Sequence, residues 1–189
     1  FRNLVVCLSC LLCLGIYHTV MRWYDRPCPS LVFYNVRGCP AIHCIAEDGT
    51  SWLNYADTLS DKRRLQAVAA NYWRRHQLLP PIEVTADCQN VDFCRHQQIV
   101  FYHGCRICMV TDNRWRNKSA ASPLFINYMY LCKGYNGRLE ELTGLFSPSC
   151  ILLDASLSDD RKQFFREECK RLHLHFITLS EEGSVRFLL

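Results

Sequence analysis

The sequence predicts an α/β domain in which sheets and helices pack in layers, preceded by one membrane-spanning helix. Three observations lead to this prediction. Residues 4–20 form an uncharged, mainly apolar run. Short strand-like segments separated by turn residues fill positions 31–56. From residue 128 onward, strand-like and helix-like segments alternate, which is typical of βαβ units.

The composition fits a globular core. Hydrophobic residues make up 49% of the 189 residues and charged residues 21%, which argues against a disordered chain. The net charge of +4 is mild, so binding to nucleic acid requires a local basic patch. The cysteines number 13 and cannot all pair with one another. We interpret Cys7, Cys10 and Cys13 as small apolar residues, and Cys105 and Cys108 as structural cysteines, with a thiol or zinc role of that pair as the alternative.

Residues 1–24 are predicted to form the transmembrane helix. Their apolar run contains no charged residue, and Trp23 and Tyr24 suit the membrane interface. A signal peptide usually ends in small residues, unlike Met21 and Arg22, although a signal peptide or a buried helix stays an alternative. Because the sequence does not begin with methionine, we interpret the helix as the last span of a multi-pass protein. Basic residues flank it on both sides, so its orientation is left open.

Periodicity and turn residues predict the remaining elements. Strands are predicted at residues 31–36, 41–46, 52–56, 98–102, 106–110, 128–131, 150–153, 174–179 and 185–189. Helices are predicted at residues 60–77 and 159–172, with Ser158 as the cap of the second. The buried face of the first helix is predicted to contain Leu65, Val68, Ala69, Tyr72 and Trp73. Its many arginines suggest a solvated face, with a phosphate-binding face as the alternative.

The common catalytic motifs are missing from the sequence. It contains no nucleophile elbow, no P-loop and no dinucleotide-binding glycine motif. His173 and His175 are the only closely spaced histidines, and no further metal ligands follow them. Asp57, Asp112 and Asp154 each follow a strand-like run. We interpret these three aspartates as caps that accept backbone hydrogen bonds from the next turn.

Three segments carry a resemblance to a known family. Residues 35–42 read NVRGCPAI, residues 109–113 read MVTDN and residues 133–137 read KGYNG. In this order they resemble the D-V-G-Q-G-D-A strand, the T-G-D strand end and the H-H-G-S turn of the C-terminal region of ComEC-type competence proteins. These proteins are membrane channels that pass single-stranded DNA into bacteria. The resemblance implies a shortened, degenerate metallo-β-lactamase-like α/β domain over residues 25–189, similar to the Bacteroidetes-like members.

The departures from the family pattern imply a lost metal centre. The H-x-H-x-D-H signature of the family is absent, and the turn at residues 133–137 contains no histidine. Asp112 alone remains as a possible ligand, and one carboxylate does not hold a catalytic ion. We therefore expect no metal, no cofactor and no catalytic residue. The vestigial site is predicted to comprise Asn35, Asp112, Lys133, Tyr135 and Asn136.

The resemblance also implies partners and a location. The partners are single-stranded DNA, the lipid bilayer, the remainder of the channel protein and other competence proteins. The location is the bacterial inner membrane, with the side of the soluble domain left open. Residues predicted to contact DNA by charge or stacking are Arg37, Arg63, Arg64, Arg114, Trp115, Arg116, Lys118, Lys133 and Arg138.

Two other hypotheses remain open at this stage. One is a membrane-anchored interaction domain that has no link to DNA. The other is a metal-dependent nuclease or hydrolase with unusual ligands, drawn from Asp57, Asp112, Asp154, His103 and His175. The second hypothesis requires these side chains to converge on one ion.

Overall fold

The computed structural model describes residues 2–24, 28–55, 59–76 and 78–189, which contain two sheets and five helices. The elements in chain order are α1 (Arg2–Tyr24), β1 (Ser30–Phe33), β2 (Ala41–Ile45), β3 (Ser51–Tyr55), α2 (Leu59–Arg75), β4 (Ile82–Val84), β5 (Cys88–Gln89), β6 (Phe93–His96), β7 (Ile99–Tyr102), β8 (Cys105–Val110), β9 (Leu124–Leu131), α3 (Leu139–Thr143), β10 (Phe146–Leu153), α4 (Asp159–Arg171), β11 (Phe176–Thr178), α5 (Leu179–Glu182) and β12 (Val185–Leu188).

The first sheet has the strand order β12-β1-β2-β3-β4. Strands β1, β2 and β3 form the predicted antiparallel meander, and Gly49 takes a φ of 84° in the turn between β2 and β3. β12 pairs antiparallel with the other side of β1, and β4 pairs parallel with β3. Every residue of β1, β2 and β3 is buried. Both faces of these three strands are therefore covered.

The second sheet has the order β11-β10-β9-β8-β7-β6-β5. Strands β8 to β11 are parallel neighbours, whereas β5 to β8 are joined as antiparallel hairpins. Parallel neighbours need crossover connections, and α3 and α4 supply two of them, between β9 and β10 and between β10 and β11. The carboxyl ends of β8, β9 and β10 consequently meet at one edge of the sheet.

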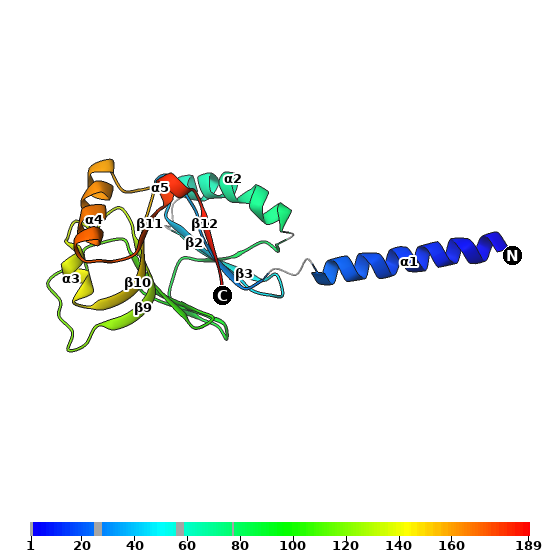
Figure 1. Ribbon diagram of the computed structural model, residues 1–189, viewed down its shortest axis with the longest axis horizontal. Coiled ribbons are helices and arrows are strands. Elements are labelled where there is room, and N and C mark those ends of the chain that lie inside the picture. The colour runs from blue at the N-terminus through cyan, green and yellow to red at the C-terminus, as the bar shows by residue number, and fades with distance from the viewer. Residues whose placement is uncertain (1, 25–27, 56–58, 77) are drawn as a thin grey trace.

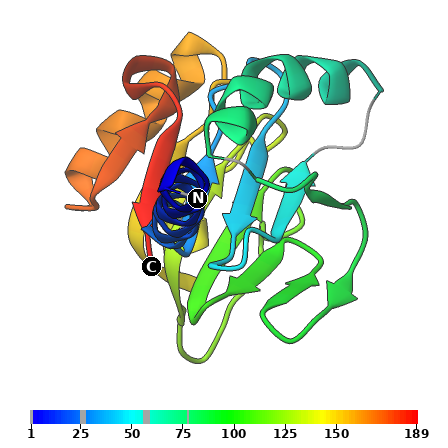
Figure 2. The same ribbon diagram turned by 90° about the vertical axis from the view of Figure 1, so that its right-hand side faces the viewer.

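The two sheets face each other and helices cover their outer faces, which gives four layers (Figure 1). Phe33 and Trp52 of the first sheet share a central apolar cluster with Tyr130 of the second. On the outer side of the second sheet, Phe165 of α4 packs into another cluster. Leu65 of α2 packs against the outer side of the first sheet. Figure 2 shows α2 (teal) and α4 (orange) on separate sides of the strands.

The buried face of α2 follows the predicted pattern with one exception. Leu65 and Ala69 are buried, and Tyr72 and Trp73 pack partly buried beside them. Val68 is 47% exposed, so its predicted place in the core is wrong. The other four residues form a stripe with spacings of four, three and one along the helix, and Val68 lies outside this stripe. It borders a surface hollow instead.

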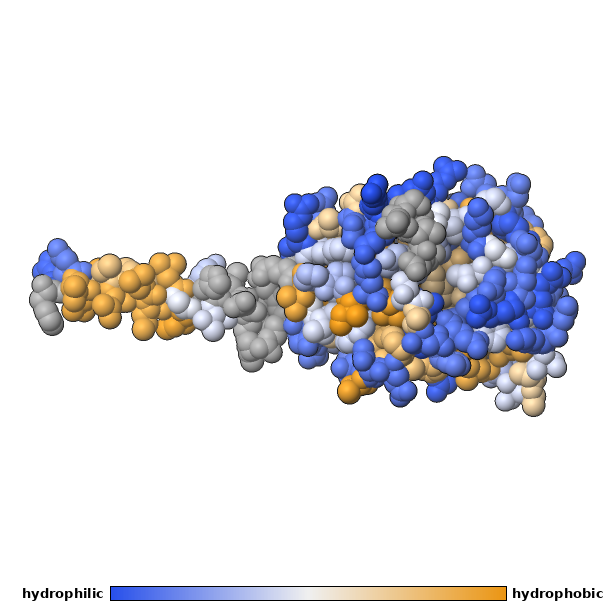
Figure 3. Space-filling view, turned by 180° about the vertical axis from the view of Figure 1, so that it is seen from behind, coloured by the Kyte–Doolittle hydropathy of each residue, from blue (hydrophilic) through white to orange (hydrophobic). Residues whose placement is uncertain are grey.

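Within the helix predicted for residues 1–24, α1 confirms the helical conformation at residues 2–24, but not the membrane span. In the part of the chain that the structure describes, no helix combines the length and the apolar character that crossing a bilayer requires. Along this helix, the described side chains are those of residues 2–17, 19 and 20. These side chains are exposed, and Figure 3 shows the helix as an apolar projection from the folded body.

Two regions differ from the sequence-based expectation. Residues 82–97, which show no clear pattern, contain the short strands β4, β5 and β6. The strand predicted at residues 174–179 ends at Thr178, opposite Leu153 of β10, and the chain then enters α5. Cys108 is fully buried on β8. Cys108 packs there in an apolar cluster with Val110 and Met129.

Candidate functional site at the edge shared by the two sheets

The register of three parallel strands defines one edge of the second sheet. Val110 of β8 lies opposite Leu131 of β9, which in turn lies opposite Leu153 of β10. The chain therefore leaves the sheet at the same level after each of these strands. In open α/β sheets this is the edge at which ligands commonly bind.

A groove at this edge joins the two sheets. Its cavity volume is about 500 Å³, and it is lined by Arg37 and Gly38 from the segment after β1, by residues 133–136 after β9, and by residues 155–158 and Arg161 after β10. We call it the edge groove. It brings together segments that are separated by about a hundred residues in the sequence.

The turn at residues 133–137 is held tightly between its neighbours. Gly134 has a φ of 112°, and a Cβ atom placed on it would lie 2.2 Å from the backbone oxygen of Thr111. The Lys133 N–H donates to Ser156 Oγ at 3.0 Å, and the Asn136 N–H donates to Asn113 Oδ1 at 2.8 Å. Only glycine fits position 134, because it tolerates both the positive φ and the close approach.

Tyr135, a predicted member of the vestigial site, points away from the groove. Its ring is buried and stacks on Phe165, and its hydroxyl donates to the backbone oxygen of Arg138 at 2.7 Å. A Cβ atom on Gly137 would lie 2.3 Å from that hydroxyl, so Gly137 leaves room for the tyrosine. Tyr135 therefore anchors the turn in the core under α4.

Asp154 is engaged in the interior, as its interpretation as a cap predicts. Its carboxylate is fully buried, accepts a hydrogen bond from the Tyr130 hydroxyl, and accepts another from the Ser156 N–H at 2.7 Å. Burial raises the pKa of this carboxyl group, and the bonds from Ser156 and Tyr130 oppose that rise. Both carboxylate oxygens of Asp154 therefore accept hydrogen bonds within the fold.

Asp112 also caps its own turn. It accepts the backbone N–H of Arg114 at 2.9 Å and two side-chain bonds from the same guanidinium, from Nε at 3.0 Å and from Nη2 at 2.8 Å. The side-chain bond from Arg114 is the main reason why the pKa of Asp112 lies below its ordinary value. This carboxylate is therefore neutralised by an arginine.

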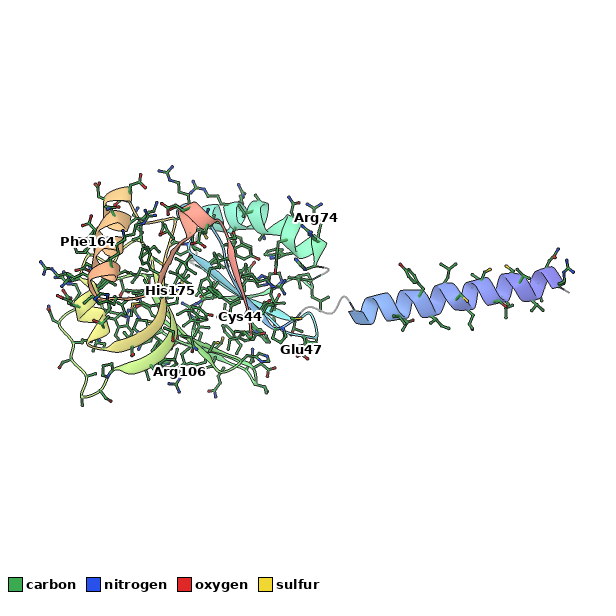
Figure 4. The ribbon with its side chains drawn as sticks, in the orientation of Figure 1. Cys44, Glu47, Arg74, Arg106, Phe164 and His175 are labelled. Atoms are coloured by element: carbon green, nitrogen blue, oxygen red, sulfur yellow. The ribbon has the colours of Figure 1, made fainter. Side chains whose placement is uncertain are left out.

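The side chains of the hydrolase hypothesis do not converge. His103 precedes β8 and His175 precedes β11, so both lie at the opposite edge of the second sheet from Asp112 and Asp154. His175 Nδ1 lies 3.2 Å from Cys150 Sγ, at the start of the buried part of β10. Figure 4 labels His175 within the body of the domain. Asp57 lies outside the described residues. Within those residues, no three His, Cys, Asp or Glu side chains are grouped to hold a metal ion.

A metal of the kind implied by the family resemblance does not fit this donor set. Asn35 and Lys133 stand where the resemblance places an aspartate and histidines, and an ammonium group repels a divalent cation. Asp112 is paired with Arg114, and Asp154 is buried with a raised pKa. We therefore assign no metal-dependent step to the edge.

The cations predicted to contact DNA divide into two groups. Arg37 and Lys133 line the edge groove, and no ion-pair partner is found for either among the described residues. Arg64 Nη1 would lie 3.4 Å from a Cβ atom on Gly38 and lines the adjoining hollow together with Arg37 and Asn35. Arg64, Arg37 and Lys133 thus follow one another along the same edge.

The other predicted contacts lie away from the groove or are already engaged. Arg116 pairs with Glu141 at 3.4 Å, and Lys118 Nζ lies over the Trp115 ring at 5.3 Å. Trp115 itself donates to Gln98 Oε1 at 2.6 Å and packs edge-on against Phe146. The last two predicted contacts, Arg63 and Arg138, are exposed outside the groove.

Arg161 is a groove residue that the sequence analysis did not select. It lies in the first turn of α4, after the cap Ser158, whose hydroxyl accepts the Arg161 N–H at 3.4 Å. Its side chain is placed over the rings of Phe164 and Phe165, at 4.7 and 4.4 Å from their centroids. Its position three residues after the helix cap Ser158 could have indicated a role at the site. The first turn of a helix that follows a parallel strand lies at the edge of the sheet where ligands commonly bind.

Fold and edge together define a four-layer α/β domain whose strand-end groove is lined by cations. Residues 31–189 match the family of the ComEC C-terminal domain. The chain therefore belongs to this family, as its sequence resemblance predicts. Comparison with curated proteins and with solved structures finds no match.

Proposed function

We propose that the chain is the C-terminal part of a ComEC-type protein of the bacterial inner membrane that takes up single-stranded DNA in natural competence. Residues 25–189 form one shortened metallo-β-lactamase-like domain, which does not catalyse hydrolysis. Family membership over residues 31–189 supports the role in competence. Two facing sheets with helices on their outer sides support the proposed fold relationship.

The observation that carries the proposal is the charge of the edge. Catalytic metal centres need several histidines or carboxylates within about 2.0–2.6 Å of one ion. Here Arg37 and Lys133 line the groove at that edge, and the nearby carboxylate of Asp112 accepts hydrogen bonds from Arg114. Such an edge attracts anions, and the DNA backbone is the anion that a DNA-uptake protein handles.

The proposed partners follow from the same assignment. Single-stranded DNA contacts the cationic edge, and the lipid bilayer, the rest of the channel protein and other competence proteins surround the domain. The domain guides or holds the strand and leaves its phosphodiester bonds intact. An interaction domain with no link to DNA is the alternative, and failure to bind single-stranded DNA at low salt favours it.

The first test measures metal content and nuclease activity. The 189-residue chain is purified without chelator, in mild detergent because α1 is apolar and exposed, and is offered manganese and zinc. We expect less than stoichiometric metal and no cleavage of single-stranded DNA, because the edge repels divalent cations.

Variants make this result decisive. Asp112→Ala tests the carboxylate at the edge, and Asp48→Ala is the matched control, since Asp48 is exposed and caps the turn between β2 and β3. One metal ion per chain, with DNA cleavage that is lost in Asp112→Ala and kept in Asp48→Ala, would contradict the proposal.

A further inference from the structure

We infer that the edge groove is a phosphate-binding site, in which Arg37, Lys133 and Arg161 hold the phosphoryl oxygens of a single-stranded nucleic acid. This inference rests on the proposed function and deepens it, because it assigns the contact with DNA to one groove and to three side chains. It also separates these residues from the other basic residues of the domain.

The charge of the groove lining is the first support. Among the described residues, the lining contains three cations and no aspartate or glutamate. Lys133 and Arg37 are exposed side chains whose charges have no carboxylate partner within the described part of the chain. The hydroxyl residues Ser156 and Ser158 also line the groove. Arginine, lysine and hydroxyl groups are the side chains that commonly bind phosphate.

Arg161 supplies a cation that is fixed in place. Its Nη2 donates to the backbone oxygens of Tyr135 at 3.3 Å and of Gly137 at 2.9 Å. The guanidinium also lies over the Phe165 ring at 4.4 Å. Its Nε is buried and has no hydrogen-bond partner among the described residues. A guanidinium already held on one side loses little conformational freedom when it binds an oxyanion on the other.

The start of α4 adds a weaker contribution. This helix has 13 residues, and Ser158 at its N-cap lines the groove. Free N–H groups and the helix dipole favour an anion there. Asp159 and Asp160 in the first turn oppose this effect. Asp159 is fully exposed and pairs with Lys162 at 3.1 Å, which limits its repulsion of a bound phosphate.

The loop after β8 is a less suitable phosphate site. Arg114 is bound by Asp112, Arg116 pairs with Glu141, and Lys118 lies over the ring of Trp115. A phosphate would have to displace the carboxylates of Asp112 and Glu141, whereas Arg37 and Lys133 are available. The structure therefore favours the edge groove over the loop as the place where DNA phosphates bind.

Further hollows adjoin the groove along the edge, which favours a strand of nucleic acid over a single small anion as the ligand. Arg37 lines the edge groove and also a neighbouring hollow with Arg64, Gly38 and Val68. A further hollow, shared with Arg37 and Ser158, contains Lys162 together with its ion-pair partner Asp159. A phosphate in the edge groove would thus have Arg64 as a further cation in the neighbouring hollow. The phosphodiester backbone matches this arrangement better than a terminal phosphate monoester.

The test is fluorescence anisotropy of a labelled oligothymidylate with the full chain in mild detergent, repeated over a range of salt concentrations. The variants are Arg37→Gln, Lys133→Gln and their double mutant, with Arg138→Gln as the matched control because Arg138 is exposed outside the groove. Each lost phosphate contact lowers the slope of log affinity against log salt by about 0.7 for a single strand. We expect this reduction in both single variants, twice as much in the double mutant, and none in Arg138→Gln.

Further probes identify the source of the phosphate. An oligonucleotide with neutral methylphosphonate linkages should lose the part of the binding that depends on the groove. Equal affinity for strands with and without a 5′-phosphate supports the backbone as the source. Tighter binding of the 5′-phosphorylated strand, abolished by Lys133→Gln, supports the same site with a monoester as its ligand. Circular dichroism verifies that Arg37→Gln and Lys133→Gln, both at exposed positions, keep the fold.

Two results on the variants would overturn the inference. One is a salt slope that is unchanged in the double mutant, and the other is an equal reduction in Arg138→Gln, which would spread the contact over the whole basic surface. Absence of DNA binding at low salt also overturns it. The metal and nuclease measurements then decide separately whether the domain is non-catalytic.

Discussion

His43 of β2 is a buried base with one hydrogen bond. Its Nδ1 accepts from the Tyr34 hydroxyl at 2.9 Å, and Trp73 Nε1 donates to the same hydroxyl at 3.0 Å. The Tyr34 proton is thus directed at His43, which places the histidine proton on Nε2. That nitrogen has no partner among the described residues, and burial lowers the pKa of His43 to about 3. The imidazole is neutral in the folded chain.

This histidine makes stability depend on pH. In the unfolded chain it titrates near its ordinary pKa of about 6.5, so the unfolded state binds more protons between that value and about 3. The free energy of unfolding therefore has its full value well above pH 6.5 and decreases as the pH falls below that value. We expect His43 to lower the free energy of unfolding by ~2 kcal/mol between pH 7 and pH 5. Urea unfolding at a series of pH values measures this slope.

His43→Phe should remove most of that slope. His76→Gln is the matched control, because burial also lowers the pKa of His76 but its side chain is only partly buried. An unchanged slope in His43→Phe, whatever the variant's stability at pH 7, would show that the buried imidazole is not its source.

At the scale of elements, the end of β8 and the turn after β9 fit each other closely. Gly134 and Gly104 both have positive φ values, 112° and 75°. A Cβ atom on Gly104 meets no atom within 4 Å, whereas one on Gly134 would lie 2.2 Å from the Thr111 oxygen. The two positions therefore separate the cost of backbone conformation from the cost of a steric clash.

Alanine substitutions measure these two costs. Gly104→Ala should lower the free energy of unfolding by ~1–2 kcal/mol, the cost of a left-handed conformation. Gly134→Ala should cost at least ~2 kcal/mol more, because the turn has to move away from β8. Chemical denaturation gives both values. Equal losses in the two variants would mean that the turn is not clamped against Thr111.

Sequence patterns predicted most of the long elements, because these have a regular buried face. Helix α2 and helix α4 lie within two residues of their predicted bounds, and the meander β1 to β3 is in place. The strands within residues 82–97 were missed because they are two to four residues long and mix exposed with buried positions. The first residues of β9 were missed because Leu124 and Phe125 remain exposed.

The candidate site was harder to predict than the elements, since it depends on the register of the second sheet. Lys133 lies in the groove, and the sequence pointed to its turn because a glycine-bracketed segment follows a strand. Tyr135 was selected from the same turn, yet its side chain fills the core. Arg161 was missed because only the parallel pairing of β9 with β10 brings the start of α4 to that edge.

At the scale of the whole molecule, the central cluster couples the two sheets. The Phe33 ring of β1 lies 5.7 Å from Tyr128 and 5.3 Å from Tyr130 of β9, and 5.9 Å from Phe187 of β12. Neither sheet can expose its inner face without disrupting these contacts. The two sheets are therefore expected to unfold as one cooperative unit.

Phe33→Ala tests this coupling. It should lower the free energy of unfolding by ~3–5 kcal/mol, as is usual for a buried aromatic ring. Phe125→Ala is the matched control, because Phe125 is 51% exposed and should change stability by no more than ~0.5 kcal/mol. Tryptophan fluorescence and circular dichroism should give coincident urea transitions in both variants. Two separated transitions would indicate that the sheets unfold independently.

The pairing of β12 with β1 has a consequence for biosynthesis. β1 opens the domain and β12 closes it, and the Leu189 N–H donates to the Pro29 oxygen at 2.9 Å beside their ladder. A nascent chain on the ribosome exposes one side of β1 until residues 185–188 emerge. During that interval the unpaired strand edge is open to pairing with other nascent chains. Folding of the first sheet therefore finishes only after almost the whole domain has been synthesised.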